Sequence, residues 1–234
     1  MKIMAMVPTY NEAENIQPLI RELLALRSDM EVVVVDDHSP DGTWQLVEEM
    51  SAANPRVHLV HRTREKGRGS AGIAGFLYAV NADADYIIEM DADFSHHPRF
   101  IPSLLEVAEK SDVVIGSRLV PGGKEVGRGQ LRPLITILAN WYIRTVLRLP
   151  VKDCTSGFRV FRRKVLEQIG LERMTSNGPA IVQEILIACH AQGFSFAEVP
   201  IVFEERLAGK STFTLRIMLN GLWSVLKFRF RRPR

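Results

Sequence analysis

Cysteine is scarce in this 234-residue sequence, which contains only Cys154 and Cys189. Neither belongs to a C-x-x-C pair or to a spacing that binds zinc. The scarcity argues against a disulfide-stabilised scaffold and against a cysteine-ligated metal domain. Two isolated thiols are typical of a protein in a reducing compartment.

Long apolar runs are also missing. No segment approaches the roughly 18 apolar residues that a helix needs to cross a bilayer. The N-terminus passes from Lys2 into a short apolar run that ends at Pro8, whereas a signal peptide has a longer apolar region and a cleavage site. We therefore expect a cytoplasmic protein which, where it meets a membrane, binds peripherally to the cytoplasmic face.

An excess of one charge is confined to the C-terminus. Five basic residues fall within the final eight positions, and without them the formal net charge changes from +3 to −2. These residues are Lys227, Arg229, Arg231, Arg232 and Arg234. A basic tail on a slightly acidic body gives little reason to expect a nucleic acid as a partner.

The sequence does contain alternating strand-like and helix-like segments. Hydrophobic residues make up 46% of the chain, which suits one α/β domain or two small ones, and we favour one. Strands are predicted at residues 3–7, 32–35, 57–60, 86–90, 113–116 and 199–203. Helices are predicted at residues 15–26, 43–53, 71–82 and 98–110. This order indicates a mostly parallel sheet with helices on both faces, which binds its ligand beyond the carboxyl ends of the strands.

The segments that follow three of these strands are polar and acidic. They read "PTYNEAEN", "DDHSPDGT" and "DADFSHHP". In the second, a structural turn would account for Pro40, Asp41 and Gly42. It would not account for Asp36 and Asp37 before the turn, so we assign these acids to a binding site.

Asp91 and Asp93 lie one residue apart at the end of the fourth predicted strand. One interpretation is a solvated helix N-terminus, where acids are favoured by the helix dipole. The interpretation that we prefer is a site for a hard divalent ion, Mg²⁺ or Mn²⁺. Such an ion binds one or two carboxylates together with the oxygens of a diphosphate.

His96 and His97 resemble zinc ligands at first sight. Adjacent histidines seldom converge on one ion, however, and no further nitrogen or sulfur ligand follows at zinc spacing. We expect them to pack or to cap the helix that starts near Pro98.

The segment "GRGSAG" matches the G-x-G-x-x-G pattern of dinucleotide-binding folds through Gly67, Gly69 and Gly72. Five residues, 62–66, separate it from His61 at the end of the preceding strand, and it belongs to the third strand–helix unit rather than the first. A glycine-rich turn that lets a helix pack closely is the better explanation.

Taken together, six segments resemble the polyprenol-phosphate (dolichol-phosphate) mannose synthases, which are inverting glycosyltransferases of family 2. They read "VPTYNEAENI", "VVVVDDHSPDGT", "REKGRGSAG", "MDADFSHHP", "IGSR" and "DCTSGFRVF". The likeness extends from Val7 to about Phe203. It implies a single Rossmann-like GT-A domain and the transfer of mannose from GDP-mannose to a polyprenyl or dolichyl phosphate, with Mg²⁺ or Mn²⁺, to give a β-linked product.

The resemblance also implies roles for individual residues. Asp91, Asp93 and Arg118 match catalytic positions, and Asp91, Asp93 and Ser95 match the metal site. The family positions that bind the nucleotide sugar correspond to Pro8, Tyr10, Glu12, Val35, Asp37, Asp91, Ala92, Arg206 and Lys210. The family positions near the acceptor phosphate correspond to Arg118, Arg132, Ser156 and Arg159. A planar guanidinium suits bidentate contact with phosphate.

Two loops depart from the family pattern. Thr212 stands where many members have lysine, with Lys210 two residues earlier, and "GPAIVQE" replaces an expected aromatic and glutamine before Glu184. Two alternatives therefore stay open: transfer of glucose or another hexose from a UDP-sugar to the same lipid, and a non-catalytic nucleotide-sugar-binding subunit. The paired acids argue against the second alternative.

Two amphipathic segments are candidates for contact with a membrane surface. Residues 133–150 form one within a catalytic domain of residues 1–212, and residues 213–234 form a C-terminal helix with a basic tail. Tryptophan and a basic end are typical of a helix that lies in the headgroup region. The alternative is that both segments are core helices.

Overall fold

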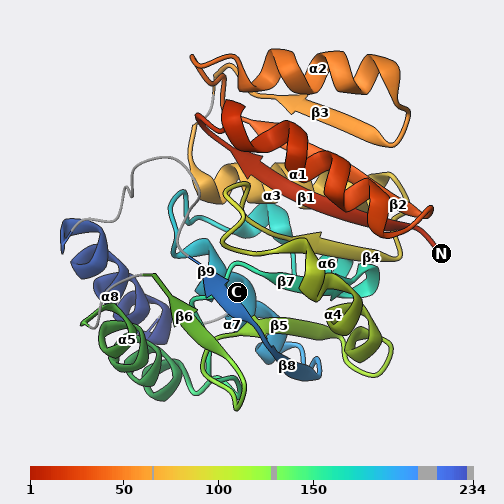
Figure 1. Ribbon diagram of the computed structural model, residues 1–234. Coiled ribbons are helices and arrows are strands. Elements are labelled where there is room, and N and C mark those ends of the chain that lie inside the picture. Colours follow the sequence, from red (N-terminus) through yellow and green to blue (C-terminus); the bar gives the residue numbers. More distant parts are fainter. Residues whose placement is uncertain (65, 128–130, 205–214, 231–234) are drawn as a thin grey trace.

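The computed structural model in Figure 1 describes residues 1–64, 66–127, 131–204 and 215–230, with positions 215–220 and 222 described by their backbone alone. Its main sheet has seven strands in the order β3-β2-β1-β4-β7-β5-β8. The strands are β1 (Ile3–Thr9), β2 (Met30–Asp36), β3 (Val57–His61), β4 (Tyr86–Glu89), β5 (Val113–Ser117), β7 (Arg159–Arg162) and β8 (Phe196–Pro200). All run parallel except β7, which is antiparallel to both of its neighbours.

The central strands are buried on both faces. Along β1, Met4 and Met6 belong to one hydrophobic cluster, whereas Ile3, Ala5 and Val7 belong to the other. Side chains alternate between the faces of a strand, so a strand that is covered on both sides has to be apolar throughout. This explains the uninterrupted apolar runs of the sequence.

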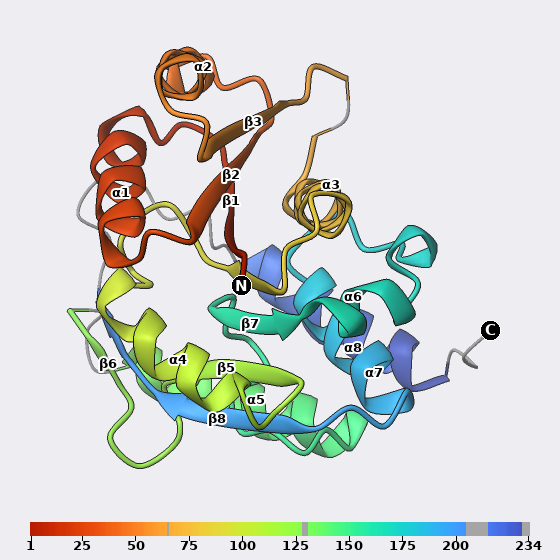
Figure 2. The same ribbon diagram turned by 90° about the vertical axis from the view of Figure 1, so that its right-hand side faces the viewer.

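Helices cover both faces of the sheet (Figure 2). The cluster on one face includes residues of α1 (Ala13–Leu26), α2 (Thr43–Ala53) and α4 (Ile101–Ala108). The cluster on the other face includes residues of α3 (Arg68–Asn81), α6 (Arg163–Gln168) and α7 (Ile181–Ala191). Two short 3₁₀ turns, η1 (Pro98–Phe100) and η2 (Leu171–Arg173), connect these elements.

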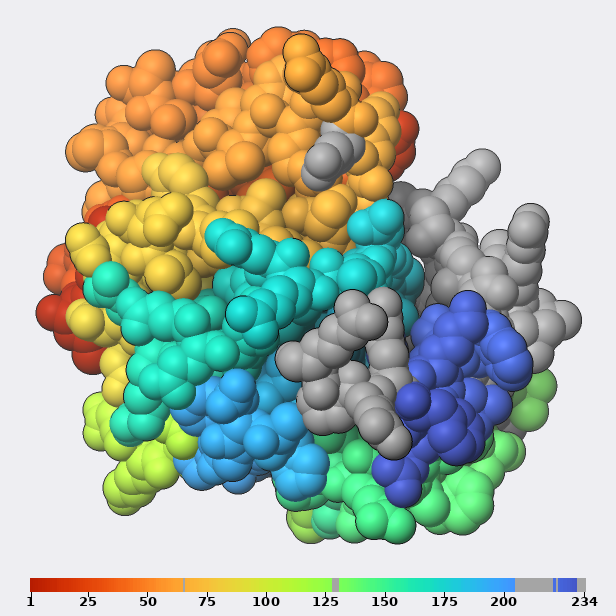
Figure 3. All heavy atoms as spheres, turned by 180° about the vertical axis from the view of Figure 1, so that it is seen from behind, coloured from red at the N-terminus to blue at the C-terminus, as the bar shows by residue number. Residues whose placement is uncertain are grey.

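A smaller unit lies at one edge of the sheet. It contains the two-stranded ribbon of β6 (Lys124–Val126) and β9 (Val202–Glu204), with α5 (Leu131–Leu147) and α8 (Leu215–Phe230) beside each other. Figure 3 shows α8, in blue, on the surface next to α5, in green. Val225 of α8 is nevertheless buried in the hydrophobic cluster. None of the helices in the described ranges is long and apolar enough to span a membrane.

The predicted architecture, a mostly parallel sheet with helices on both faces, is confirmed. The strand predicted at residues 199–203 is wrong, because it straddles two strands. β8 ends at Pro200, which lacks an N–H group, and β9 begins at Val202 and pairs with β6 instead of the main sheet. The antiparallel strand β7 was not predicted.

Glycines let α3 pack closely, as the "GRGSAG" segment predicts. A Cβ atom on Gly69 would lie 1.9 Å from the carbonyl oxygen of Ser176, and one on Gly75 would lie 2.4 Å from Cγ of Met6. Gly67 precedes the helix with φ = 139°, a conformation that favours glycine. The amino end of α3 thereby packs against Ser176 and Asn177, before α7, and its middle packs against β1 and β2.

Candidate active site

The two acids at the end of β2 have different roles. Asp36 is fully buried and ties the ends of β1 and β2 together, because its carboxylate accepts hydrogen bonds from the Thr9 hydroxyl (2.8 Å) and from the Ser39 amide (2.8 Å) and hydroxyl (2.7 Å). Asp37 instead contacts Arg62 and Gly67, which follow β3 in the chain. One of its oxygens accepts from the Gly67 amide (2.7 Å), and the other lies 3.2 Å from Nη1 of Arg62.

The residues expected around the nucleotide lie near this edge, but not all are accessible. Tyr10 is half exposed, with Nζ of Lys66 5.6 Å from its ring centre. Glu12 directly precedes α1, and its carboxylate accepts a hydrogen bond from the Asn15 side chain (2.8 Å). Val35 is fully buried, so its side chain belongs to the core rather than to an open site. Pro8, which pairs with Val35 in the sheet, is partly buried, and Ala92 is buried.

Asp91 and Asp93 follow β4 and differ in exposure. The Asp93 carboxylate is buried, and its Oδ1 accepts hydrogen bonds from the Ser95 amide (3.1 Å) and hydroxyl (2.5 Å). The Asp91 side chain is 36% exposed, and its Oδ1 lies 3.2 Å from Nη2 of Arg68. A guanidinium of the protein therefore neutralises part of the charge of this acidic pair.

His96 and His97 have the packing and capping roles that their sequence context predicts. His96 is buried, stacks on Phe158 and accepts a hydrogen bond from the Asp91 amide at Nδ1 (3.1 Å). Burial lowers the pKa of His96, which favours the neutral ring that this hydrogen bond requires. His97 accepts from the Arg99 amide (3.2 Å) at the start of η1.

The expectation that Arg159 contacts the acceptor phosphate is corrected by its position. Arg159 is fully buried in the sheet, where its guanidinium donates to the Glu89 carboxylate (2.8 Å from Nε) and to the Val182 carbonyl (3.1 Å). Glu89 uses its other oxygen to accept from Nη1 of Arg68 (3.0 Å). The ion pairs thus form a chain from Arg159 through Glu89 and Arg68 to Asp91.

Sequence reasoning missed Glu89 and Arg68. One signal for Glu89 is visible: an acid inside the apolar strand "YIIEM" needs a partner once it is buried. The signal for Arg68 is weaker, since it consists of a basic residue at the start of a helix, where the dipole favours acids.

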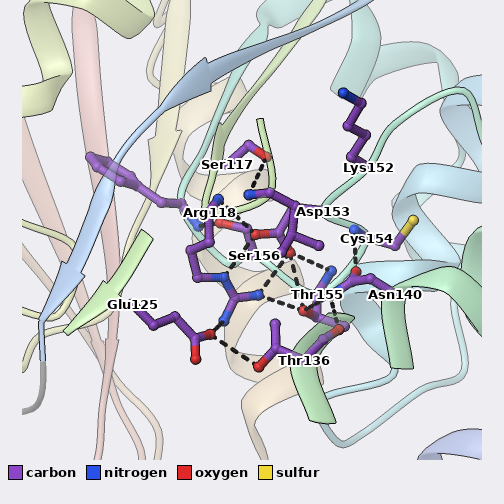
Figure 4. A network of polar contacts seen from close by, with 12 residues as sticks. Ser117, Arg118, Glu125, Thr136, Asn140, Lys152, Asp153, Cys154, Thr155 and Ser156 are labelled. Carbon is purple, nitrogen blue, oxygen red and sulfur yellow. Dashed lines mark hydrogen bonds and ion pairs between the residues drawn. The ribbon is translucent and has the colours of Figure 1, made fainter. Parts of the chain in front are cut away.

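Arg118 follows β5 and lies at the centre of the network in Figure 4. Its Nε and Nη2 each donate to an oxygen of Asp153 (2.7 Å), Nη1 donates to Glu125 (2.9 Å), and Nη2 also donates to Thr155 (2.6 Å). Burial raises the pKa of Asp153, but Arg118 more than offsets this and holds it below the ordinary value. Two carboxylates therefore already balance the charge of Arg118.

The other residues expected at the acceptor phosphate are spread out. The buried Ser156 hydroxyl donates to the Gly116 carbonyl (2.6 Å), so it stabilises the loop before β7. Arg132 is exposed on α5. Arg206 and Lys210, together with Thr212, lie outside the described residues. Glu184, at the second departure from the family pattern, accepts from the amides of Thr175 and Ser176 and so fixes the turn against Gly69.

The acidic pair suits a metal ion that is shared with a ligand. In the described ranges, no group of three or more His, Cys, Asp or Glu side chains forms a complete metal cage. The carboxylates of Asp91 and Asp93 and the Ser95 hydroxyl are hard oxygen donors of the kind that Mg²⁺ and Mn²⁺ prefer. A Cβ on Gly157 would lie 3.8 Å from Oδ1 of Asp91, so the missing side chain leaves space beside this oxygen.

Comparison with known proteins places the chain in a family. The family model for glycosyl transferase family 2 matches residues 5–170. An undecaprenyl-phosphate mannosyltransferase of Micrococcus luteus is 39% identical, over 97% of this chain and 94% of its own. A polyprenol monophosphomannose synthase of Mycolicibacterium smegmatis is 36% identical, over 98% of this chain and 88% of its own.

A solved structure agrees at the level of the fold. Glucosyl-3-phosphoglycerate synthase from Mycobacterium tuberculosis, in complex with Mn²⁺, UDP-glucose and glycerol 3-phosphate, superposes with a TM-score of 0.67 at 20% identity, over all of this chain and 81% of its own. The GT-A architecture is thereby confirmed. The family match covers more than half of the chain and agrees with the acidic strand ends. The chain is therefore a glycosyltransferase and belongs to glycosyltransferase family 2.

Proposed function

We propose that the enzyme transfers mannose from GDP-mannose to a polyprenyl or dolichyl phosphate, with inversion, to give polyprenyl-phosphate β-mannose. The observation that carries this proposal is the similarity to two relatives that are named for mannose transfer to a polyprenol phosphate, at 36–39% identity along nearly the whole chain. The acids at the strand ends support a nucleotide-sugar donor.

The donor binds at the carboxyl ends of β1, β2 and β4. Tyr10, Glu12 and Asp37 receive the nucleotide, and Asp91, Asp93 and Ser95 hold Mg²⁺ or Mn²⁺ together with the diphosphate. The bound ion neutralises the charge that develops on the leaving nucleoside diphosphate. Arg206 and Lys210 complete the donor site in this proposal.

The acceptor supplies its own nucleophile. A phosphate monoester is anionic at neutral pH, so one of its oxygens attacks the anomeric carbon while the bond from that carbon to the diphosphate breaks. No proton has to be removed by a protein base. The task of the chain is to hold the two anionic substrates in line against their mutual repulsion.

Arg118 and Arg132 are the arginines that we assign to the acceptor phosphate. For Arg118, the phosphate has to replace a carboxylate of the network. Glu125 is the partner most readily replaced, because its Oε2 is buried and has no hydrogen-bond partner in the part of the chain that the structure describes. The phosphate oxygens would take over the Nη1 donor, while Asp153 stays on Nε and Nη2.

A lipid acceptor requires the enzyme to reach a membrane surface, and α5 provides an apolar stripe for this. Its exposed residues recur at helical spacing: Leu131 (74% exposed), Leu134 (53%), Leu138 (56%) and Trp141 (66%). On α8, Trp223 (59%) and Phe230 (82%) are also exposed. We propose that residues 133–150, within the catalytic domain of residues 1–212, lie in the headgroup region together with residues 213–234, of which 213–214 and 231–234 are outside the described residues.

The membrane face that we propose is the cytoplasmic one. Cys154 and Cys189 are both free and buried, as expected for a protein of a reducing compartment. Burial raises the pKa of each thiol to about 12, so neither is a reactive thiolate at neutral pH.

The donor can be tested with a panel of labelled GDP- and UDP-sugars, polyprenyl phosphate and Mg²⁺. We expect label from GDP-mannose to enter the lipid, and label from UDP-glucose to enter at a much lower rate. Preferred transfer from a UDP-sugar would establish the alternative donor. The absence of transfer from every donor, with the protein folded, would favour a non-catalytic subunit.

The metal assignment predicts the behaviour of Asp93→Asn. This change keeps a hydrogen-bond acceptor for Ser95 but removes the negative charge, so turnover should fall at least about 100-fold while the fold is retained. Asp83→Asn, the same change at an exposed acid before β4, serves as the control. Full activity of Asp93→Asn, or of the wild type in EDTA, would show that no ion acts there.

If the apolar stripe of α5 contacts the membrane, Leu134→Ser combined with Leu138→Ser should weaken binding to anionic phospholipid vesicles about tenfold or more. The reason is that less apolar area is buried in the lipid. The matched control, Gln45→Ser with Glu49→Ser, changes two exposed residues one turn apart on α2. Sedimentation with vesicles measures both. Unchanged binding of the leucine variant would mean that this stripe faces something other than a membrane.

A further inference from the structure

Arg68 has an unfavourable position for a basic residue. It is the first residue of α3, directly after Gly67, where the dipole of the helix favours acids. Its side chain is 26% exposed and lies between two carboxylates, with Nη1 3.0 Å from Glu89 and Nη2 3.2 Å from Asp91. A conflict between local preference and position is typical of a functional residue.

The guanidinium of Arg68 is fixed from the core outward. Glu89 is buried and gives one oxygen to Arg159 and the other to Arg68. A guanidinium is not deprotonated in proteins, and Glu89 and Asp91 hold this one in place. Arg68 is therefore a permanent positive charge at a fixed position.

The positive charge of Arg68 lies beside the Asp91 carboxylate, which would otherwise attract a metal ion. Oδ1 of Asp91 is the oxygen that accepts from Arg68, and it is also the oxygen beside the space left by Gly157. A Cβ on Gly157 would lie 3.0 Å from Nη2 of Arg68, so the same space adjoins both groups. An incoming cation meets a carboxylate that is already half neutralised and a guanidinium that repels it.

We propose that Arg68 is a positioning residue that holds Asp91 in the donor-free enzyme and competes with the divalent ion for its carboxylate. The ion then binds tightly only together with the diphosphate of the nucleotide sugar. This inference rests on the proposed metal role of Asp91 and Asp93.

The consequence is coupling between the two ligands. A diphosphate adds negative charge and oxygen ligands at the site, which outweigh the repulsion by Arg68. Coupling between two binding events is reciprocal, so the ion and the nucleotide each strengthen the binding of the other. The device keeps the ion from occupying the enzyme without a donor.

The test is the affinity of the donor-free protein for Mn²⁺, measured by the electron paramagnetic resonance of free Mn²⁺. Arg68→Gln should bind Mn²⁺ about tenfold more tightly than the wild type, because one repelling charge is removed. Arg68→Lys, which keeps the charge, should stay near the wild-type value. Arg21→Gln makes the same change in net charge on the exposed face of α1 and should have no effect.

The inference is wrong if the charge-free variant binds Mn²⁺ equally or less tightly. Arg68→Met replaces Arg68→Gln if circular dichroism shows that the latter does not fold. Asp93→Asn, titrated with Mn²⁺ in the presence of GDP, tests the metal site separately. If Asp93→Asn binds Mn²⁺ normally, the metal assignment itself fails. If it binds weakly while donor-free affinity is unchanged in Arg68→Gln, only the role of Arg68 fails.

Discussion

The buried ion pair between Glu89 and Arg159 is the constraint on which the site depends. Both side chains are fully buried between two hydrophobic layers, and their residues lie opposite each other on β4 and β7. A carboxylate at this depth costs several kcal/mol unless a charged partner satisfies it. The antiparallel strand β7 brings that partner into an otherwise parallel sheet, between β4 and β5. The position of β7 in the sheet therefore makes a buried carboxylate on β4 possible.

From this pair the charges alternate toward the surface. Glu89 fixes Arg68, Arg68 holds Asp91, and Asp91 is followed by Asp93 with its own hydrogen bonds from Ser95. The neighbouring acids of the proposed donor site are thus stabilised by the protein itself, without a ligand. Arg118, which we propose contacts the acceptor phosphate, is likewise balanced by protein charges, those of Asp153 and Glu125. Without ligands, Arg68 occupies the position beside Asp91 that we propose for the metal ion, and Glu125 occupies the position beside Arg118 that we propose for the acceptor phosphate.

Much of this arrangement is predictable from the sequence, because it follows from local patterns. Apolar runs locate five of the seven main-sheet strands, the run at residues 199–203 overlaps only the end of β8, and the glycines of "GRGSAG" indicate a closely packed helix. The histidines also follow their local context. Arg159 was misplaced because a buried arginine and a phosphate-binding arginine look alike in sequence. Only the sheet order reveals that Arg159 faces Glu89, and that order depends on contacts between residues 70 positions apart.

The most direct test of this account is the free energy of unfolding of Glu89→Gln, measured by urea denaturation. The account predicts a loss of about 3–5 kcal/mol, because Arg159 is left buried without its counter-charge. Glu167→Gln is the control, since Glu167 pairs with Arg163 at the surface and should contribute less than about 1 kcal/mol. If Glu89→Gln is as stable as Glu167→Gln, the buried pair does not organise the site, and the account is contradicted.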